Sequence, residues 1–226
     1  MKIKINYLDH EIEFSKESVS VLEIENKKYF YRIVLGLYNI FQKNISDEII
    51  FLDEQNHELN YSNKLKIFID YFDFQLGSKK VINEISRYIE SELDEEHREQ
   101  LIKQYTKIGN IYKKILNEID LPLSINPDID IENLTKLMKL NIVMKNDLLD
   151  NLLLLIDLEK VLKTNNLLVF VNLKQYLTRE ELLEFYKYSI YNQVDVLLID
   201  SQSYGTKLEF EKKLIIDSDL DEFMLE

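Results

Sequence analysis

The first quarter of the chain combines short strand-like runs with one helix-like run. Ile3 and Ile5 alternate with polar residues, and residues 18–24 are rich in β-branched side chains, so we expect a small β-meander here. Residues 27–43 carry apolar side chains at helical spacing, and a strand-like run follows over residues 48–52. The order strand, helix, strand is therefore predicted.

The middle of the chain has a helical pattern. Gly77 interrupts the preceding segment and Ser78 can cap a helix, while a second helix begins near Glu95. The apolar residues of this second helix step by four and three, the spacing of a seam between packed helices: Leu101, Tyr105, Ile108, Tyr112, Ile115 and Ile119. We favour an intramolecular helical hairpin, with an intermolecular coiled coil as the alternative.

Two prolines, Pro122 and Pro127, end the long helix, and helical patterns resume over residues 132–142 and 147–162. The latter segment is apolar around most of its circumference, which indicates that it is nearly enclosed. We therefore predict a helical leg domain over residues 78–163, inserted into a head domain formed by residues 1–77 and 164–226.

The last part of the chain predicts a parallel sheet. Residues 167–172 and 194–200 are continuous apolar runs, joined through a predicted helix over residues 178–190 that Thr178 and Glu181 start with a capping box. Such runs are typical of a right-handed βαβ crossover in a sheet that is covered on both faces. The expected fold is an α/β head with a mainly parallel sheet, plus the inserted helical leg.

Composition narrows the class of protein. The sequence has no cysteine, which excludes disulfides and thiolate metal sites, and it offers neither a signal-peptide core nor an apolar stretch of membrane-spanning length. We expect a cytoplasmic protein. The net charge of −13 opposes binding of a polyanion as a whole, so the local distribution of charge decides that question.

Motifs of catalysis are missing from the sequence. The four glycines do not form the G-x-x-x-x-G-K-[ST] loop that binds phosphate, and Asp200 is interpreted as a turn residue at a strand end rather than a magnesium ligand. His10, His57 and His97 are far apart, and no G-x-S-x-G elbow occurs. We therefore predict no enzyme activity, with a metal-dependent nuclease or a degenerate nucleotide hydrolase as one alternative and a coiled-coil interaction scaffold as another.

Lysines are segregated within the predicted leg. Residues 100–114 and 133–146 contain lysines and no acidic residue, whereas residues 115–132 contain acidic residues and no lysine or arginine. The candidate DNA-binding residues are Lys103, Lys107, Lys114, Lys136, Lys139 and Lys145. Lys103, Lys107 and Lys114 project from one helical side, as contacts to phosphates require, although exposed helices often carry lysines without a binding role.

The acidic segment between the lysines is a candidate metal site. Asp128, Asp130 and Glu132 alternate with apolar residues and could present three carboxylates from one side of an extended segment. Such hard oxygen ligands suit calcium or magnesium. Alternatively, Asp130 caps the helix that begins at the next residue.

Three segments of the chain resemble a known family. These are residues 167–172, the run Tyr176-Leu177-Thr178-Arg179-Glu180-Glu181, and residues 194–200. They are similar to the CRISPR-associated subtype II-A adaptation protein family, and weaker agreement from the Tyr7-Leu8-Asp9 opening onwards extends the resemblance over essentially the whole chain.

The resemblance implies a homotetrameric ring of subunits, each with an α/β head related to phosphate-loop ATPases and a helical leg. Such a ring encloses double-stranded DNA, binds DNA ends without sequence preference, and assists spacer acquisition alongside the CRISPR integrase complex and the effector nuclease. It also implies calcium held by leg carboxylates. Glu118 and Asp120 match the family's acidic stretch, Asp128 and Asp130 are expected to substitute for its later acids, and Lys136 falls where the family has a basic residue.

Overall fold

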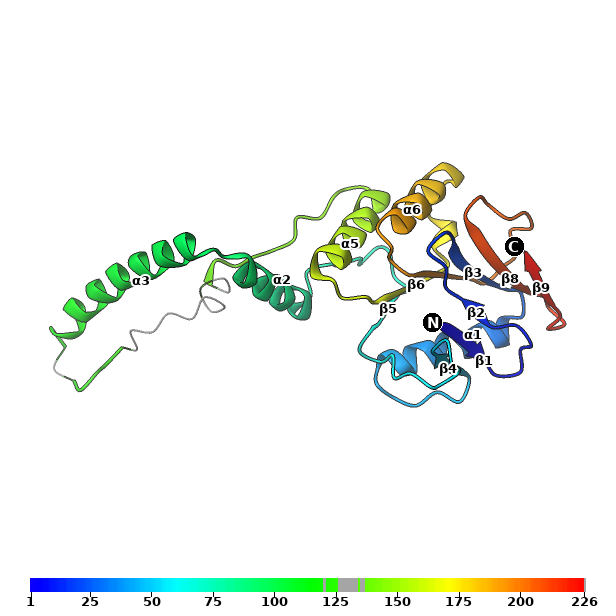
Figure 1. Cartoon of the computed structure of the whole chain (residues 1–226), viewed down its shortest axis with the longest axis horizontal. Coiled ribbons are helices and arrows are strands. Elements are labelled where there is room, and N and C mark those ends of the chain that lie inside the picture. Colours follow the sequence, from blue (N-terminus) through cyan, green and yellow to red (C-terminus); the bar gives the residue numbers. More distant parts are fainter. Residues whose placement is uncertain (120, 126–133, 135–136, 226) are drawn as a thin grey trace. The chain divides into compact units, whose positions relative to one another are not determined.

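The computed structural model describes residues 1–119, 121–125, 134 and 137–225. The chain forms two compact units (Figure 1). Residues Met1–Phe74 and Met144–Glu226 make up the first unit, called the head here, and Gln75–Val143 make up the second, called the helical unit.

The head contains a six-stranded sheet with the strand order β5-β6-β7-β3-β8-β9. Every neighbouring pair is parallel except β8 and β9, which are antiparallel. The strands are β3 (Val19–Ile24), β5 (Leu65–Phe68), β6 (Leu167–Val171), β7 (Val196–Asp200), β8 (Glu211–Ile216) and β9 (Glu222–Leu225). The predicted α/β class with a mainly parallel sheet is confirmed.

A second, three-stranded antiparallel sheet consists of β1 (Lys2–Ile5), β2 (Ile12–Glu13) and β4 (Ile49–Leu52), with β1 in the centre. The prediction that residues 18–24 belong to an N-terminal meander is wrong. All six residues of β3 are buried, and β3 pairs in parallel with both β7 and β8 in the larger sheet. A strand with two covered faces fits the interior of a parallel sheet, whereas a strand with one solvated face fits a meander.

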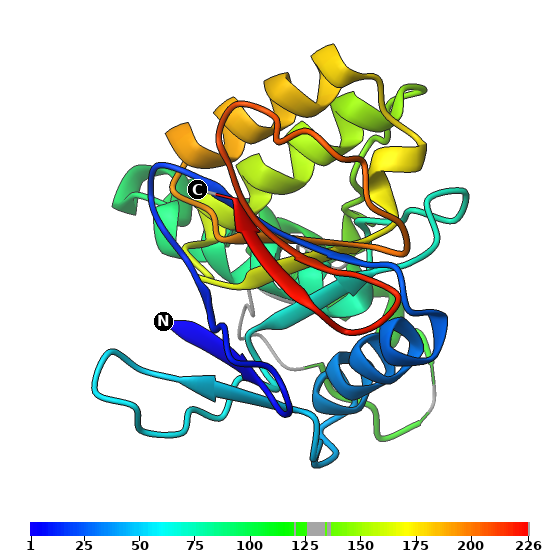
Figure 2. The same cartoon turned by 90° about the vertical axis from the view of Figure 1, so that its right-hand side faces the viewer.

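Helices lie over both faces of the six-stranded sheet (Figure 2). On one face, α1 (Lys27–Phe41) and the three-stranded sheet pack over a core that includes Ile5, Leu22, Ile33 and Ile199. On the other face lie α5 (Leu148–Leu162) and α6 (Arg179–Tyr191), where Phe170 of β6 meets the ring of Phe185 edge-on, with ring centres 5.4 Å apart.

The predicted βαβ crossover is present. Strand β6 runs through the short 3-10 helix η1 (Leu173–Gln175) and α6 to β7, and β6 and β7 pair in parallel. The capping box that starts α6 is complete, since Thr178 Oγ1 accepts from the Glu181 backbone N–H and Glu181 accepts from the Thr178 backbone N–H.

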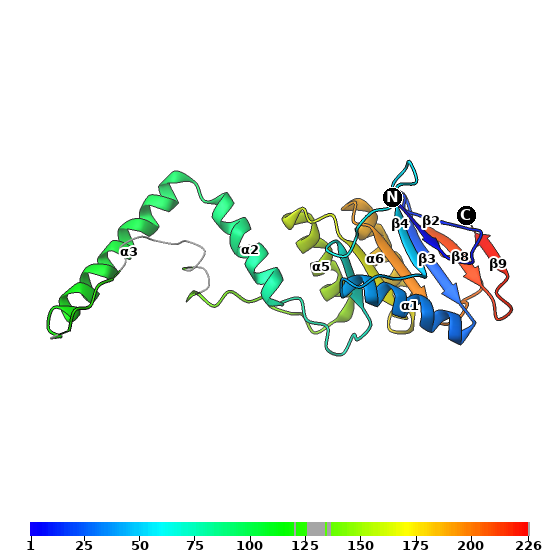
Figure 3. The ribbon, with the colours of Figure 1, turned by 90° about the horizontal axis from the view of Figure 1, so that it is seen from below.

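The helical unit contains α2 (Lys79–Glu92) and α3 (Glu95–Leu116), seen from below in Figure 3. Ser78 caps α2, as predicted, and Asp94 caps α3. Of the predicted helix over residues 132–142, positions 132, 133, 135 and 136 lie outside the described residues, and residues 138–142 are not helical, so the prediction is wrong for its second half. Within the described part of the chain, no helix is long and apolar enough to cross a membrane.

The helical unit is shorter than the predicted leg. The prediction placed residues 147–162 in the leg, but α5 belongs to the head. It packs against α6 and buries Leu152, Leu155 and Ile156 there, which is why its sequence is apolar around most of its circumference.

Candidate functional site

Helix α3 carries two different faces. At about 100° per residue, Lys103, Lys107 and Lys114 lie within roughly 40° of one another, and this lysine stripe is centred roughly 140° from the apolar seam. All three lysines are exposed. The helix therefore separates a positively charged face from an apolar one.

The apolar seam of α3 is open to solvent. No residue of α3 is buried, and Ile108, Tyr112 and Ile115 are 49%, 57% and 51% exposed. The intramolecular hairpin predicted for this seam is therefore not formed by the described residues. Aliphatic side chains exposed in a row at heptad-like spacing are typical of a helix that packs against a partner helix.

The remaining predicted DNA-binding residues are not part of α3. Lys139 is exposed in the helical unit with a backbone φ of 52°. Lys145 is exposed but belongs to the head, where its backbone N–H donates to the side-chain oxygen of Asn151 at 2.8 Å. Lys136 lies outside the described residues.

Of the four predicted metal ligands, only Glu118 is described. It is exposed, and its backbone N–H donates to the Ile115 carbonyl just beyond the end of α3. Asp120, Asp128 and Asp130 lie outside the described residues. Within the described part of the chain, no three acidic or histidine side chains are grouped closely enough to hold a metal ion.

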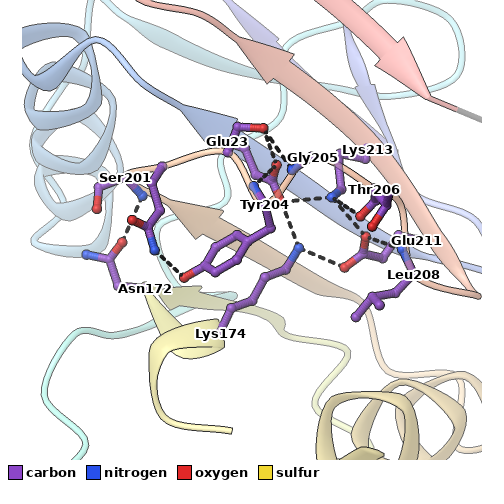
Figure 4. A network of polar contacts seen from close by, with 12 residues as sticks. Glu23, Asn172, Lys174, Ser201, Tyr204, Gly205, Thr206, Leu208, Glu211 and Lys213 are labelled. Atoms are coloured by element: carbon purple, nitrogen blue, oxygen red, sulfur yellow. Dashed lines mark hydrogen bonds and ion pairs between the residues drawn. The ribbon is translucent and has the colours of Figure 1, made fainter. Parts of the chain in front are cut away.

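The head contains a buried ring of four charged side chains beside the six-stranded sheet (Figure 4). Lys174 Nζ lies 2.9 Å from Glu23 and 2.7 Å from Glu211, and Lys213 Nζ lies 2.9 Å and 3.3 Å from the same two carboxylates. Each lysine thus bridges both glutamates, and all four side chains are at most 3% exposed. We call this group the charge ring.

Hydrogen bonds complete the shell around the charge ring. Glu23 accepts from the hydroxyl of Ser203 and the backbone N–H of Tyr204. Glu211 accepts from the hydroxyl of Tyr186 at 2.9 Å and from the backbone N–H of Leu208 at 3.0 Å. Buried charges are tolerated when each is paired and hydrogen-bonded, which is the case here.

Pairing within the charge ring outweighs burial. Burial alone raises the pKa of the Glu211 carboxyl, but Lys174, the Leu208 N–H and Lys213 together hold this pKa below its ordinary value. Burial alone lowers the pKa of Lys174, but Glu211 and Glu23 raise it above the ordinary value. Both groups are therefore charged at neutral pH.

Asp200 lies beside the charge ring without being part of it. It is the last residue of β7 and has no exposed surface. Neither carboxylate oxygen accepts a hydrogen bond of normal geometry, although the backbone N–H of Lys174 is near enough to lower its pKa slightly. Burial raises the pKa of Asp200 to about 7, because Glu23 and Glu211 add to the effect of burial and Lys174 offsets it only in part. The prediction that Asp200 lies at a strand end is confirmed, but it is the buried last residue of β7 and not part of the turn that follows.

The junction where a phosphate-binding loop would be expected is closed. Only Glu25 and Asn26 connect β3 to α1, and the Asn26 side chain accepts from the Tyr29 backbone N–H at the start of α1. A phosphate-binding loop needs several residues whose backbone N–H groups remain free for the ligand. In addition, the side chains of Lys174 and Lys213 fill the space between Glu23 and Glu211.

Sequence reasoning missed the charge ring. The available signal was Glu23 within the strand-like run over residues 18–24, where a buried charge needs a partner of opposite sign. What the sequence did not reveal is the pairing, because Glu23 and Lys174 are 151 residues apart.

The fold of this chain is similar to that of a solved structure. The crystal structure of Stu0660 of Streptococcus thermophilus aligns with a TM-score of 0.63 and 15% identity, over 96% of this chain and 75% of that chain. A bacterial Atm1-family ABC exporter with ATP bound aligns with a TM-score of 0.40 and 11% identity, over 96% of this chain and 36% of that chain.

No curated protein matches the sequence significantly. The family model described as CRISPR-associated protein (Cas_Csn2) matches residues 42–220, which include most of the segments on which the sequence resemblance was based. The match covers well over half of the chain and confirms that resemblance. This chain therefore belongs to the CRISPR-associated protein family Cas_Csn2.

Proposed function

We propose that this CRISPR-associated protein binds double-stranded DNA, at its ends and without sequence preference, as a homotetrameric ring that supports spacer acquisition. The observation that carries the proposal is the division of α3 into a lysine stripe and an exposed apolar seam. The stripe supplies cations for phosphates, and the seam supplies a surface for other copies of the chain.

Charge explains why DNA would be confined to the lysine stripe. A chain of net charge −13 repels a polyanion over most of its surface. Lysines from several identical copies, converging on one duplex, would add their attraction at a single place. Contacts of this kind go to the phosphate backbone and carry no sequence information.

The proposal includes no enzyme activity. The head lacks a phosphate-binding loop between β3 and α1, and the carboxylates of Glu23 and Glu211 are paired with Lys174 and Lys213. We also propose the CRISPR integrase complex and the effector nuclease as partners. This part of the proposal rests on the family resemblance alone. The proposal also includes calcium. Its proposed ligands are the carboxylates of Glu118 and of Asp120, Asp128 and Asp130, the last three of which lie outside the described residues.

We predict that replacing Lys103, Lys107 and Lys114 together by Glu lowers the affinity for linear duplex DNA at least a hundredfold. Each neutralised phosphate contributes about 0.9 to the slope of log affinity against log salt, so the slope should also fall by up to about 2.7 per subunit. A fluorescence-anisotropy titration at several salt concentrations measures both effects.

A matched variant with Lys4, Lys187 and Lys207 replaced by Glu in the head has the same net charge and should retain most of the affinity. Equal loss in both variants, or no loss in the first, would exclude the lysine stripe as the contact surface.

We predict that the assembly depends on the apolar seam. Replacing Ile108 and Ile115 by Asp places two charges on the seam and should convert an assembly of four 27.1 kDa chains into smaller species. Size-exclusion chromatography with light scattering, with and without calcium, measures the mass. Thr106→Asp with Asn110→Asp adds the same charges on the opposite side of α3 and should leave the mass unchanged. A seam variant of unchanged mass would contradict the prediction.

A further inference from the structure

The geometry points to a second anion-binding site, in the head, at the edge of the sheet where the parallel strands begin. A pocket of about 400 Å³ lies among the last turns of α5 and α6 and the loops that lead into β3, β5, β6 and β7. We propose that this pocket binds a small polyphosphorylated ligand. Its volume falls within the range of small-molecule sites, and it lies far along the strands from the edge where doubly wound folds normally bind phosphates.

Lysines dominate the charge of the pocket. Four line it, Lys16, Lys64, Lys160 and Lys163, against two acids, Glu159 and Asp195. Among the described residues, Lys16, Lys64 and Lys163 are exposed and take part in no ion pair.

The two acids cancel only part of this positive charge. Glu159 is 4% exposed, and Lys66, which does not line the pocket, approaches it to 2.5 Å. The other oxygen of Glu159 accepts from the amide of Asn166 at 2.8 Å and from the hydroxyl of Thr164. Burial raises the pKa of Asp195, and the N-terminal amino group and Lys16 lower it in part, so this carboxylate offsets no more than one of the four lysines. An excess of positive charge remains in a chain of net charge −13.

The C-terminal ends of α5 and α6, which lie at the pocket, repel a bound anion only weakly. Each helix C-terminus carries roughly half a negative charge, in total less than the lysines provide. The last carbonyls are also occupied, since the Lys163 and Thr164 N–H groups donate to the end of α5, and the Asn192 and Gln193 N–H groups donate to the end of α6. The net charge of the pocket is therefore positive, because the lysines outweigh the helix ends.

Uncharged donors complete the site. The side chains of Ser18, Asn165 and Gln193 line the pocket and make no hydrogen bond within the described part of the chain. Asn165 and Gln193 have backbone φ values of 49° and 57°, in the left-handed region, which costs stability for residues other than glycine. Free hydroxyl and amide donors next to unpaired lysines are the groups that recognise phosphate oxygens. Repulsion among the lysines is relieved when a polyanion binds between them.

Calorimetric titration of the full chain with inorganic triphosphate, ATP and adenosine tests the proposal. We expect triphosphate and ATP to bind and adenosine not to bind, because the pocket recognises phosphate. Replacing Lys16 and Lys64 by Glu should weaken triphosphate binding at least thirtyfold. A control with Lys4 and Lys207 replaced by Glu has the same net charge and should change the affinity less than threefold.

The same variants separate this site from the proposed DNA surface. Replacing Lys16 and Lys64 by Glu should leave the affinity for duplex DNA within threefold of the original, since neither lysine is on α3. Failure of triphosphate and ATP to bind at millimolar concentration would overturn the proposal, as would equal weakening in both variants. If the pocket variant unfolds, as judged by circular dichroism, Lys16→Gln with Lys64→Gln replaces it with the same expectation of weaker binding.

Discussion

Replacing Lys213 by Met is expected to lower the free energy of unfolding by about 3 to 5 kcal/mol, the cost of removing one partner from a buried ion pair. The change leaves Glu23 and Glu211 with Lys174 as their only shared cation, in a part of the head where none of the four side chains is more than 3% exposed. Urea unfolding followed by circular dichroism measures the difference.

The neighbouring residue provides a matched control for Lys213. Lys212 lies in the same strand, and its side chain pairs with Glu13 at 2.9 Å, but Glu13 is 60% exposed. Surface pairs contribute about 0 to 1 kcal/mol, so Lys212→Met should cost less than about 1 kcal/mol. Adding Glu211→Gln to Lys213→Met restores a balance of one glutamate and one lysine and should recover part of the loss. A cost for Lys213→Met no larger than that for Lys212→Met would show that the charge ring is not required for stability.

The charge ring bears on function as well as stability. In doubly wound folds, ligands bind outside the carboxyl ends of the strands. Here Glu23 lies near the end of β3, but Tyr204 and the two lysines cover it from the adjacent loop, η1 and β8 (Figure 4). The head is thus held together by charges at a place where related folds keep an open site, which agrees with the proposal of a binding protein without catalysis.

Several elements of the fold could be predicted because their signals are local. Continuous apolar runs identified β6 and β7, and the Thr178 and Glu181 capping box located the start of α6. Ser78 identified the start of α2 for the same reason. Caps and periodicity depend on neighbours within a few residues, so a single sequence contains them.

Other features depend on contacts between distant segments and could not be predicted. β3 resembled a meander strand because its partners, β7 and β8, lie more than 170 residues later in the chain. The assignment of α5 to the leg failed because its apolar circumference gives no indication of which unit encloses it. On the candidate site, helical spacing alone placed Lys103, Lys107 and Lys114 on one side of α3, whereas spacing could not relate Lys139 or Lys145 to them.

The ionisation of Asp200 should make the stability of the folded head depend on pH. Its pKa rises from 3.8 in the unfolded chain to about 7 in the folded head, so the folded state binds its proton more tightly. The contribution of Asp200 to the free energy of unfolding is fully present below about pH 4 and is lost as the pH rises towards 7. The loss reaches about 4 kcal/mol, at roughly 1.4 kcal/mol for each unit of difference between the two pKa values. Asn cannot ionise, so Asp200→Asn should be more stable than the original chain at pH 8 by about that amount, with little difference at pH 4.

Comparing the two proteins at each pH isolates Asp200 from other titrating groups. Glu211 and Glu222 have lowered pKa values and favour folding above their titration range, but they are the same in both proteins. Unfolding free energies measured in urea at pH 4, 6 and 8 should therefore diverge steadily, with the Asn variant gaining. The charged groups that face Asp200, Glu23, Glu211 and Lys174, remain unchanged in that variant. A constant difference across this range would mean that Asp200 is ionised in the folded head, and that the backbone N–H of Lys174 stabilises its charge far more than the geometry indicates.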